Sequence, residues 1–331
     1  MQLPTYKKMM IFSGTANRPL AEEIATHLGM KLGGVEIETF ANSESYTRFM
    51  DSVRGVDAFV IQSMCEPVDH HVMQQLIMID ALKRASAKRI TAVCPFYPYS
   101  RQDRKARGRE PITAKLIGNM YQAAGVNRML SVDLHSGQIQ GFLDVPFDHL
   151  TALPLLADYF ADVIEGQEFV IVSPDPGGVN LADKFVRHLN EYNGVDGGHV
   201  AFLHKQRRKD VRNVTETKSV VGDVDGKLCI VMDDFIDTAG TLTQGAERLL
   251  EAGASAVHAA ATHPVLSDPA VDRIKNSPIK QVVVTNTLPI PSEKQLDKLV
   301  VLSIAPTIAQ TIKAVFEEES VSELFHGENQ P

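Results

Sequence analysis

Short apolar runs rich in β-branched residues alternate with amphipathic helical patterns along the chain. Such alternation indicates parallel sheets whose strands are joined by crossover helices. We therefore expect an α/β fold made of mainly parallel sheets flanked by helices. The predicted strands cover residues 9–12, 58–62, 89–93, 128–132, 169–172, 200–203, 228–232, 256–261 and 281–284.

The predicted helices carry apolar side chains at helical spacing. One of them places four apolar residues on one side: Val72, Leu76, Ile79 and Leu82. Another begins with Thr113 as its N-cap and ends at Gly125, a residue type that suits the position just after a helix. A third stops similarly at Gly253, and a last helix covers residues 306–316.

The length of 331 residues suits two domains of about 150 residues each. The best boundary lies at residues 148–154, with one predicted sheet before it and another after it. We expect domains at 1–150 and 151–305.

The composition is that of a soluble globular protein, with 44% apolar residues and a net charge of −8. This charge argues against general binding to nucleic acid or to membranes. Three cysteines (Cys65, Cys94 and Cys229) have no metal-ligand spacing, which indicates reduced thiols. No apolar run approaches the roughly eighteen residues of a membrane-spanning helix, and the first residues lack a signal-peptide core. We expect a cytoplasmic protein.

Segment 227–243 carries the strongest chemical signal. A predicted strand runs into two acids, Asp233 and Asp234, and a small-residue loop then opens an amphipathic helix. Backbone N–H groups of such a loop, together with the helix dipole, favour a bound phosphate. The two carboxylates would repel a phosphate, so we assign them to sugar hydroxyls, directly or through Mg²⁺. Segment 227–243 therefore predicts a site for a phosphorylated ribose, although strand–loop–helix junctions and strand-end acids also occur without function.

Other predicted strands end in loops that suit the same edge of a sheet, where ligands of open α/β sheets bind. Five of the nine residues from Arg101 to Arg109 are basic, which favours a loop that closes over a polyanion such as a nucleoside triphosphate. A solvated surface loop is the alternative. Asp175 precedes two glycines, which suits phosphate or metal, and an ordinary turn equally. His135 follows another strand and could face the same cleft.

Two alternating patterns complete the candidates. In an extended chain Lys205 and Arg207 share a face, where two cations can neutralise charge on a transferring phosphoryl group. A basic surface patch is the alternative. Phe40, Asn42 and Glu44 alternate in the same way and could stack on and hydrogen-bond an adenine.

Taken in order, these segments resemble the ribose-phosphate pyrophosphokinase (PRPP synthetase) family along nearly the whole chain. The matching stretches are IFSGTANRPLAEEIATHLG, SVRG, PYSRQDRKARGREPITAKL, VDLHSGQIQGF, HKQR, VMDDFIDTAGT, VVVTNT and ESVSELF. The resemblance implies transfer of the β,γ-diphosphoryl group of ATP to the 1-hydroxyl of ribose 5-phosphate, which gives PRPP and AMP, with Mg²⁺ as cofactor.

The resemblance also implies residue roles. Lys205 matches the catalytic lysine, and Arg207 matches its partner, which also contacts ribose 5-phosphate. His135 and Asp175 match Mg²⁺ positions, with Asp133 as a further candidate. The implied ribose 5-phosphate residues are Asp233, Asp234, Asp237, Thr238, Ala239, Gly240 and Thr241. The implied ATP residues are Phe40, Asn42, Ser43, Glu44, Arg101, Gln102, Asp103, Arg104 and Lys105.

The family further implies two phosphoribosyltransferase-like domains, a C-terminal helix at about 306–320 that packs back on the first domain, and a hexamer built from dimers. Regulation by phosphate and ADP is common in it. Departures from the family pattern occur at Ala41, Ser43, Pro176 and Leu181. Two rivals stay open: a PRPP-consuming phosphoribosyltransferase, and a non-catalytic regulatory subunit.

Overall fold

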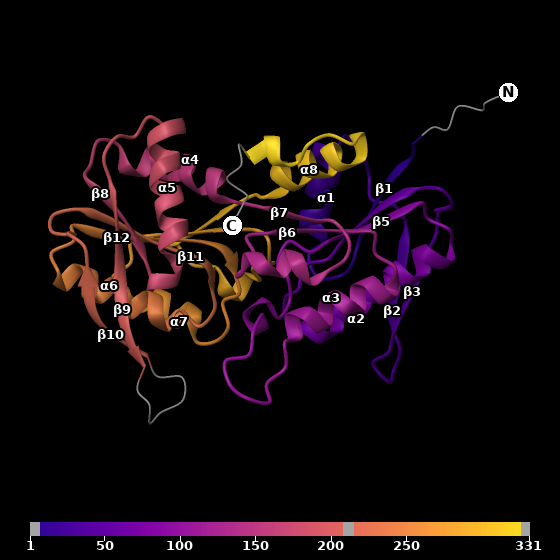
Figure 1. Cartoon of the computed structure of the whole chain (residues 1–331), viewed down its shortest axis with the longest axis horizontal. Coiled ribbons are helices and arrows are strands. Elements are labelled where there is room, and N and C mark those ends of the chain that lie inside the picture. Colours follow the sequence, from indigo (N-terminus) through magenta and orange to yellow (C-terminus); the bar gives the residue numbers. More distant parts are fainter. Residues whose placement is uncertain (1–6, 208–214, 326–331) are drawn as a thin grey trace. The chain divides into compact units, whose positions relative to one another are not determined.

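The computed structural model describes residues 7–207 and 215–325, without the side chains of residues 205–218 (Figure 1). The chain forms two compact units. The first contains Met1–Thr151, Thr287–Pro289 and Ile304–Pro331, and the second contains Ala152–Asn286 and Ile290–Ser303. Each unit is an α/β body with its own core.

The first unit is built on a parallel sheet with strand order β1-β4-β5-β6-β7. Its strands are β1 (Met9–Ser13), β4 (Asp57–Ile61), β5 (Arg89–Val93), β6 (Arg128–Val132) and β7 (Phe147–Leu150). A separate antiparallel hairpin joins β2 (Val35–Thr39) to β3 (Ser45–Phe49).

Helices cover both faces of this sheet (Figure 1). On one face α2 (Val68–Arg84) and α3 (Thr113–Ala124) bury an apolar stripe against alternate strand residues such as Phe12 and Val60. On the other face α1 (Arg18–His27) lies beside α8 (Ala305–Glu317), which returns from the end of the described chain. Ile308 and Ile312 of α8 are fully buried, as expected, whereas Val315 and Phe316 are half-buried.

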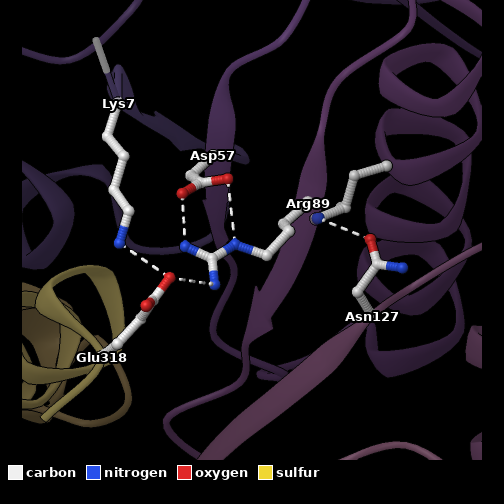
Figure 2. A network of polar contacts seen from close by, with 6 residues as sticks. Lys7, Asp57, Arg89, Asn127 and Glu318 are labelled. Carbon is white, nitrogen blue, oxygen red and sulfur yellow. Dashed lines mark hydrogen bonds and ion pairs between the residues drawn. The ribbon is translucent and has the colours of Figure 1, made fainter. Parts of the chain in front are cut away.

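Charged residues connect the end of α8 to the sheet of the first unit (Figure 2). Glu318, just after the helix, accepts from Lys7 at 2.7 Å and lies 3.6 Å from Arg89. Arg89 in turn donates twice to the buried carboxylate of Asp57, and Asn127 Oδ1 accepts from the backbone N–H of the next residue, Ile90, at 2.8 Å. We call Lys7, Glu318, Arg89 and Asp57 the α8 clasp.

The second unit contains a sheet with strand order β10-β9-β8-β11-β12-β13-β14. All neighbours are parallel except β9 and β10. The strands are β8 (Phe169–Ser173), β9 (His199–Arg207), β10 (Thr215–Val221), β11 (Leu228–Ile236), β12 (Ala256–Pro264), β13 (Val282–Thr285) and β14 (Leu299–Leu302). Helices α4 (Leu153–Ile164) and α5 (Val179–Tyr192) lie on one face, and α6 (Gly240–Glu251) and α7 (Ala270–Asn276) on the other (Figure 1).

Short 3₁₀ helices fill several connections. They are η1 (Ser100–Gln102), η2 (Gly137–Phe142), η3 (Pro176–Gly178), η4 (Ser292–Lys294) and η5 (Ser322–Phe325). Within the described residues, no helix is both long and apolar enough to cross a membrane.

The structure confirms every predicted strand and corrects some boundaries. Thr113 is the first helical residue of α3 and not its N-cap; its hydroxyl donates to Gln102 Oε1 at 2.5 Å instead. Asp233 and Asp234 lie inside β11, which continues to Ile236, and do not follow the strand as predicted. Strands β2, β3, β7, β10 and β14 were not predicted, because they are short, charged or at sheet edges.

Candidate active site

The second sheet reverses its strand order between β8 and β11. From β8 the chain moves to β9 and β10 on one side, and it then returns to β11 on the other. Val172 and Val231 are paired neighbours on these two strands, so both strands end at the same edge of the sheet. Such a switch point separates the loops that follow the two strands and leaves room for a ligand.

Three carboxylates gather at this switch point. Asp233 and Asp234 lie in the last part of β11, and Asp175 follows β8. Burial, the charge of Asp234 and the charge of Asp175 together raise the pKa of Asp233 well above its ordinary value. The Asp233 carboxylate also accepts from the backbone N–H of Asp234 at 2.9 Å. Such a cluster gains from a bound cation or from hydroxyl donors, and its hard oxygen atoms fit Mg²⁺.

The small-residue loop lies between β11 and α6. Ala239 has a left-handed backbone (φ 56°), and α6 begins at the next residue, Gly240. The first turn of α6 contains no acid, and Thr243 closes it by bonding back to the carbonyl oxygen of Ala239. The backbone N–H groups of the first turn of α6 have no acceptor within the helix. They can therefore donate hydrogen bonds to an anion bound at the loop.

The loop after β8 is partly organised by its own acid. Asp175 Oδ1 accepts from Gly177 N at 2.9 Å, and Ser173 Oγ donates to the carbonyl oxygen of Asp175 at 2.5 Å. A side chain at Gly178 would lie 2.7 Å from Ser173 Oγ, so this position requires glycine. The loop thus has the backbone of a turn, and the charge of Asp175 in it acts on Asp233.

The basic pair lies on β9, which extends to Arg207. Lys205 pairs with Thr217 and Arg207 with Thr215 on the antiparallel strand β10. The extended backbone expected for this pair is confirmed, and alternation places both residues on one face. Their side chains lie outside the described part of the structure.

The predicted metal loop of the first unit follows β6. Asp133 has a left-handed backbone (φ 36°), which is unfavourable for a residue with a Cβ atom. Two successive residues of β7 hold this loop: Leu150 O accepts from Asp133 N, and His149 Nε2 accepts from Leu134 N, both at 2.9 Å. Sequence reasoning missed His149, because the four residues of β7 show no strand or ligand pattern.

The predicted ATP loop begins in η1. Arg101 and Gln102 belong to this helix, and Asp103 accepts from Gln138 Nε2 at 2.7 Å. Arg104 and Lys105 are exposed and have no acidic partner among the described residues. Their charges are therefore available to a polyanion.

The predicted adenine segment is the turn of the β2–β3 hairpin, and the extended alternation expected for it is wrong. Phe40 N donates to Glu44 O at 2.8 Å, and Ser43 has a left-handed backbone (φ 72°). Asn42 Oδ1 accepts from Glu44 N at 3.2 Å. The Phe40 ring is 49% exposed and lies 5.8 Å from the ring of Tyr46, so an aromatic surface is present at the hairpin tip.

No group of three or more histidine, cysteine or acidic side chains with metal-site geometry occurs within residues 7–207 and 215–325. Mg²⁺ commonly keeps several waters and binds through one or two carboxylates plus substrate phosphates. The absence of a three-ligand cage in the described chain is compatible with that mode of binding. The three cysteines are free thiols, as expected.

Comparisons with known proteins identify the family of the chain. A family model for the N-terminal domain of ribose phosphate pyrophosphokinase matches residues 9–125, and a phosphoribosyl synthetase-associated domain matches residues 204–326. The ribose-phosphate pyrophosphokinase of Streptomyces coelicolor is 52% identical over 96% of both chains. The chain belongs to the ribose-phosphate pyrophosphokinase family.

Two further relatives extend this result. The enzyme of the same name from Caldanaerobacter subterraneus subsp. tengcongensis is 51% identical, over 96% of this chain and 98% of the relative. The crystal structure of phosphoribosylpyrophosphate synthetase from Mycobacterium smegmatis matches with a TM-score of 0.88 and 49% identity, over 94% of this chain and 100% of that one. Family membership therefore rests on sequence and on fold alike.

Proposed function

We propose that this protein transfers the β,γ-diphosphoryl group of ATP to the 1-hydroxyl of ribose 5-phosphate and so forms PRPP and AMP. One observation carries the proposal. An acid pair and a small-residue anion loop flank the same switch point of the second sheet, in a chain that is 52% identical to a ribose-phosphate pyrophosphokinase. Together they fit a sugar that carries both hydroxyls and a phosphate.

The second unit supplies the groups for the sugar phosphate. The N–H groups of the Asp237–Thr241 loop would bind the 5-phosphate, and Asp233 and Asp234 would accept from the ribose hydroxyls. Both interactions leave the 1-hydroxyl unbound. Its oxygen attacks the β-phosphorus and its proton passes to water. The bond from that phosphorus to the bridging α-phosphate oxygen breaks, and AMP leaves with this oxygen.

Charge stabilisation supplies the catalysis of such a transfer. Lys205 and Arg207 share one strand face and would neutralise the phosphate oxygens at the reacting centre. In the first unit Asp133 and His135 would be Mg²⁺ ligands, and in the second unit Asp175 would be one. Bound Mg²⁺ would offset the charge of the triphosphate. His135 is the less usual ligand, because Mg²⁺ prefers oxygen.

For ATP, we propose contacts from the hairpin tip and from the basic loop. Phe40 would stack on the adenine, with Asn42, Ser43 and Glu44 beside it. Arg101, Gln102, Asp103, Arg104 and Lys105 would approach the phosphates. The exposed Phe40 ring and the unpartnered charges of Arg104 and Lys105 support this proposal.

The direct test is incubation of the purified chain with ATP, Mg²⁺ and ribose 5-phosphate while AMP is measured. We expect AMP and PRPP in equal amounts, and no AMP without ribose 5-phosphate. A PRPP-consuming phosphoribosyltransferase would instead release pyrophosphate from PRPP and a base. A regulatory subunit would be inactive alone. AMP release that does not need ribose 5-phosphate contradicts the proposal.

Lys205→Ala tests the proposed catalytic residue. We expect turnover to fall by about 10²-fold or more with little change in ribose 5-phosphate binding, because the lost contact belongs to the transition state. Lys227→Ala is the matched control, since Lys227 precedes β11 at the opposite end of the strands of the same sheet and forms an ion pair with Asp223 at 2.6 Å. Near-normal turnover of Lys205→Ala would remove this residue from its role.

We also propose that the chain acts in the cytoplasm as a homo-oligomer, a hexamer built from dimers, with regulation by phosphate and ADP. The family membership supports this assembly. Sedimentation of the purified protein, with and without phosphate and ADP, tests it. A monomer that is fully active under all these conditions would contradict it.

A further inference from the structure

Arg273, a residue without an assigned role, lies against the small-residue loop. It belongs to α7, and its Nη1 atom donates to the carbonyl oxygen of Thr238 at 2.9 Å across 35 positions of the sequence. A Cβ atom added to Gly240 would lie 3.1 Å from the same Nη1 atom. The guanidinium therefore contacts the loop on both sides of Ala239.

The loop needs such a support. Ala239 is buried and has a left-handed backbone, which is unfavourable for a residue with a Cβ atom. A hydrogen bond from a charged donor to the preceding carbonyl group stabilises this conformation. The same hydrogen bond holds the Thr238 carbonyl oxygen toward α7. The N–H groups of the loop remain able to bind an anion.

The charge of Arg273 has a second effect. The loop carries Asp237 but no cationic side chain, and Asp233 and Asp234 precede it. Within the described residues Arg273 forms no ion pair, so its charge is not cancelled by a carboxylate. A phosphate dianion that approaches the loop meets these acids and the guanidinium of Arg273 beside the start of α6.

We propose that Arg273 is a positioning residue for ribose 5-phosphate: it fixes the phosphate loop and offsets the negative charge around it. The proposal rests on the proposed function, since it assumes that the loop binds the 5-phosphate. It assigns Arg273 no contact with the substrate. Its effect should therefore appear in the affinity for the sugar phosphate and leave ATP binding unchanged.

The test compares Arg273→Met, Arg273→Lys and the wild type in the AMP assay. For Arg273→Met we expect the KM for ribose 5-phosphate to rise about tenfold, as expected for one charge-assisted contact, with the KM for ATP and kcat within about twofold. Arg273→Lys keeps the charge and should recover most of the affinity. The salt dependence of the ribose 5-phosphate KM should be weaker in Arg273→Met than in the wild type.

Arg248→Met is the matched control. Arg248 lies near the other end of α6, pairs with Glu251 at 2.5 Å, and should leave both KM values unchanged. An unchanged ribose 5-phosphate KM in Arg273→Met overturns the inference. It is also overturned if the KM for ribose 5-phosphate and the KM for ATP rise equally in the Met and Lys variants, because such a result indicates a general structural role. If Arg273→Met does not fold, the Lys variant decides: an equal rise of both its KM values overturns the inference. A wild type without AMP formation overturns the proposed function itself.

Discussion

At the scale of single residues, the site places like charges together. Asp233 is the clearest case, because burial, then Asp234 and then Asp175 raise the pKa of its carboxyl group. A folded-state pKa above the unfolded value means that stability is greatest in acid and is lost as the pH rises through the folded pKa. The ligand-free protein therefore carries a charge penalty at neutral pH, which bound substrate and cation would relieve.

Asp233→Asn tests this penalty. Asparagine keeps an oxygen for the Asp234 N–H group but removes the charge, so we expect the variant to melt above the wild type at pH 8 without ligands. The difference should shrink as the pH falls toward 4. Ribose 5-phosphate-dependent activity should fall by about tenfold or more, because a charged acceptor for a sugar hydroxyl is lost. Asp297→Asn, at an exposed acid, is the control and should show no such pH trend. A variant that is less stable than the wild type at pH 8 contradicts the assignment.

His149 lies outside the predicted metal loop and holds it by a hydrogen bond. Its Nε2 atom accepts from Leu134 N, so the imidazole is unprotonated at that atom. His149→Gln offers an oxygen at a similar reach, whereas His149→Met offers none. We expect about tenfold more Mg²⁺ for half-maximal activity in the Met variant, the usual scale for a group that orients a ligand loop, and a smaller change in the Gln variant. Equal Mg²⁺ requirements in both variants would show that the hydrogen bond does not position the loop.

At the scale of elements, the buried parallel strands were predictable and the edges were not. Runs such as 89–93 and 128–132 are buried on both faces and mostly apolar because helices cover both sides, and this pattern can be read directly. Strand β10 was not predicted, because most of its pairing with β9 lies beyond residue 203, where the predicted strand ended. The turn at residues 40–44 imitates an extended alternation, since a five-residue segment holds too little information to separate the two conformations.

The candidate site divides in the same way. The acids and the small-residue loop could be predicted from one continuous segment. His149 and Arg273 could not, because each reaches a loop that is distant in sequence through one side-chain hydrogen bond. Tertiary contacts of this kind leave no periodic signal.

At the scale of the whole molecule, the α8 clasp joins the last described helix to the sheet of the first unit (Figure 2). Asp57 is almost fully buried, and its partner Arg89 is about one-third exposed. Removal of one charged residue from such a pair leaves the charge of the other without a partner.

Asp57→Asn should therefore lower the opening free energy of β4 and β5 by about 2 kcal/mol, less than for a fully buried pair because water reaches Arg89. Hydrogen exchange measured by mass spectrometry would detect this as faster exchange in peptides from β4 and β5. Glu318→Gln is the control, because Glu318 is exposed and its loss should change only the end of α8. Exchange that is unchanged in β4 and β5 of Asp57→Asn would show that the pair does not stabilise the sheet.

The return of α8 to the first unit has a consequence for biosynthesis. A polypeptide leaves the ribosome from its amino end. The strands of the first unit are therefore synthesised long before α8, which completes that unit. Until Ile304 and the residues after it are translated, the sheet face that α8 covers stays open to water. A nascent chain arrested before this point should therefore bind chaperones through that face, and release of the last helix should end the binding.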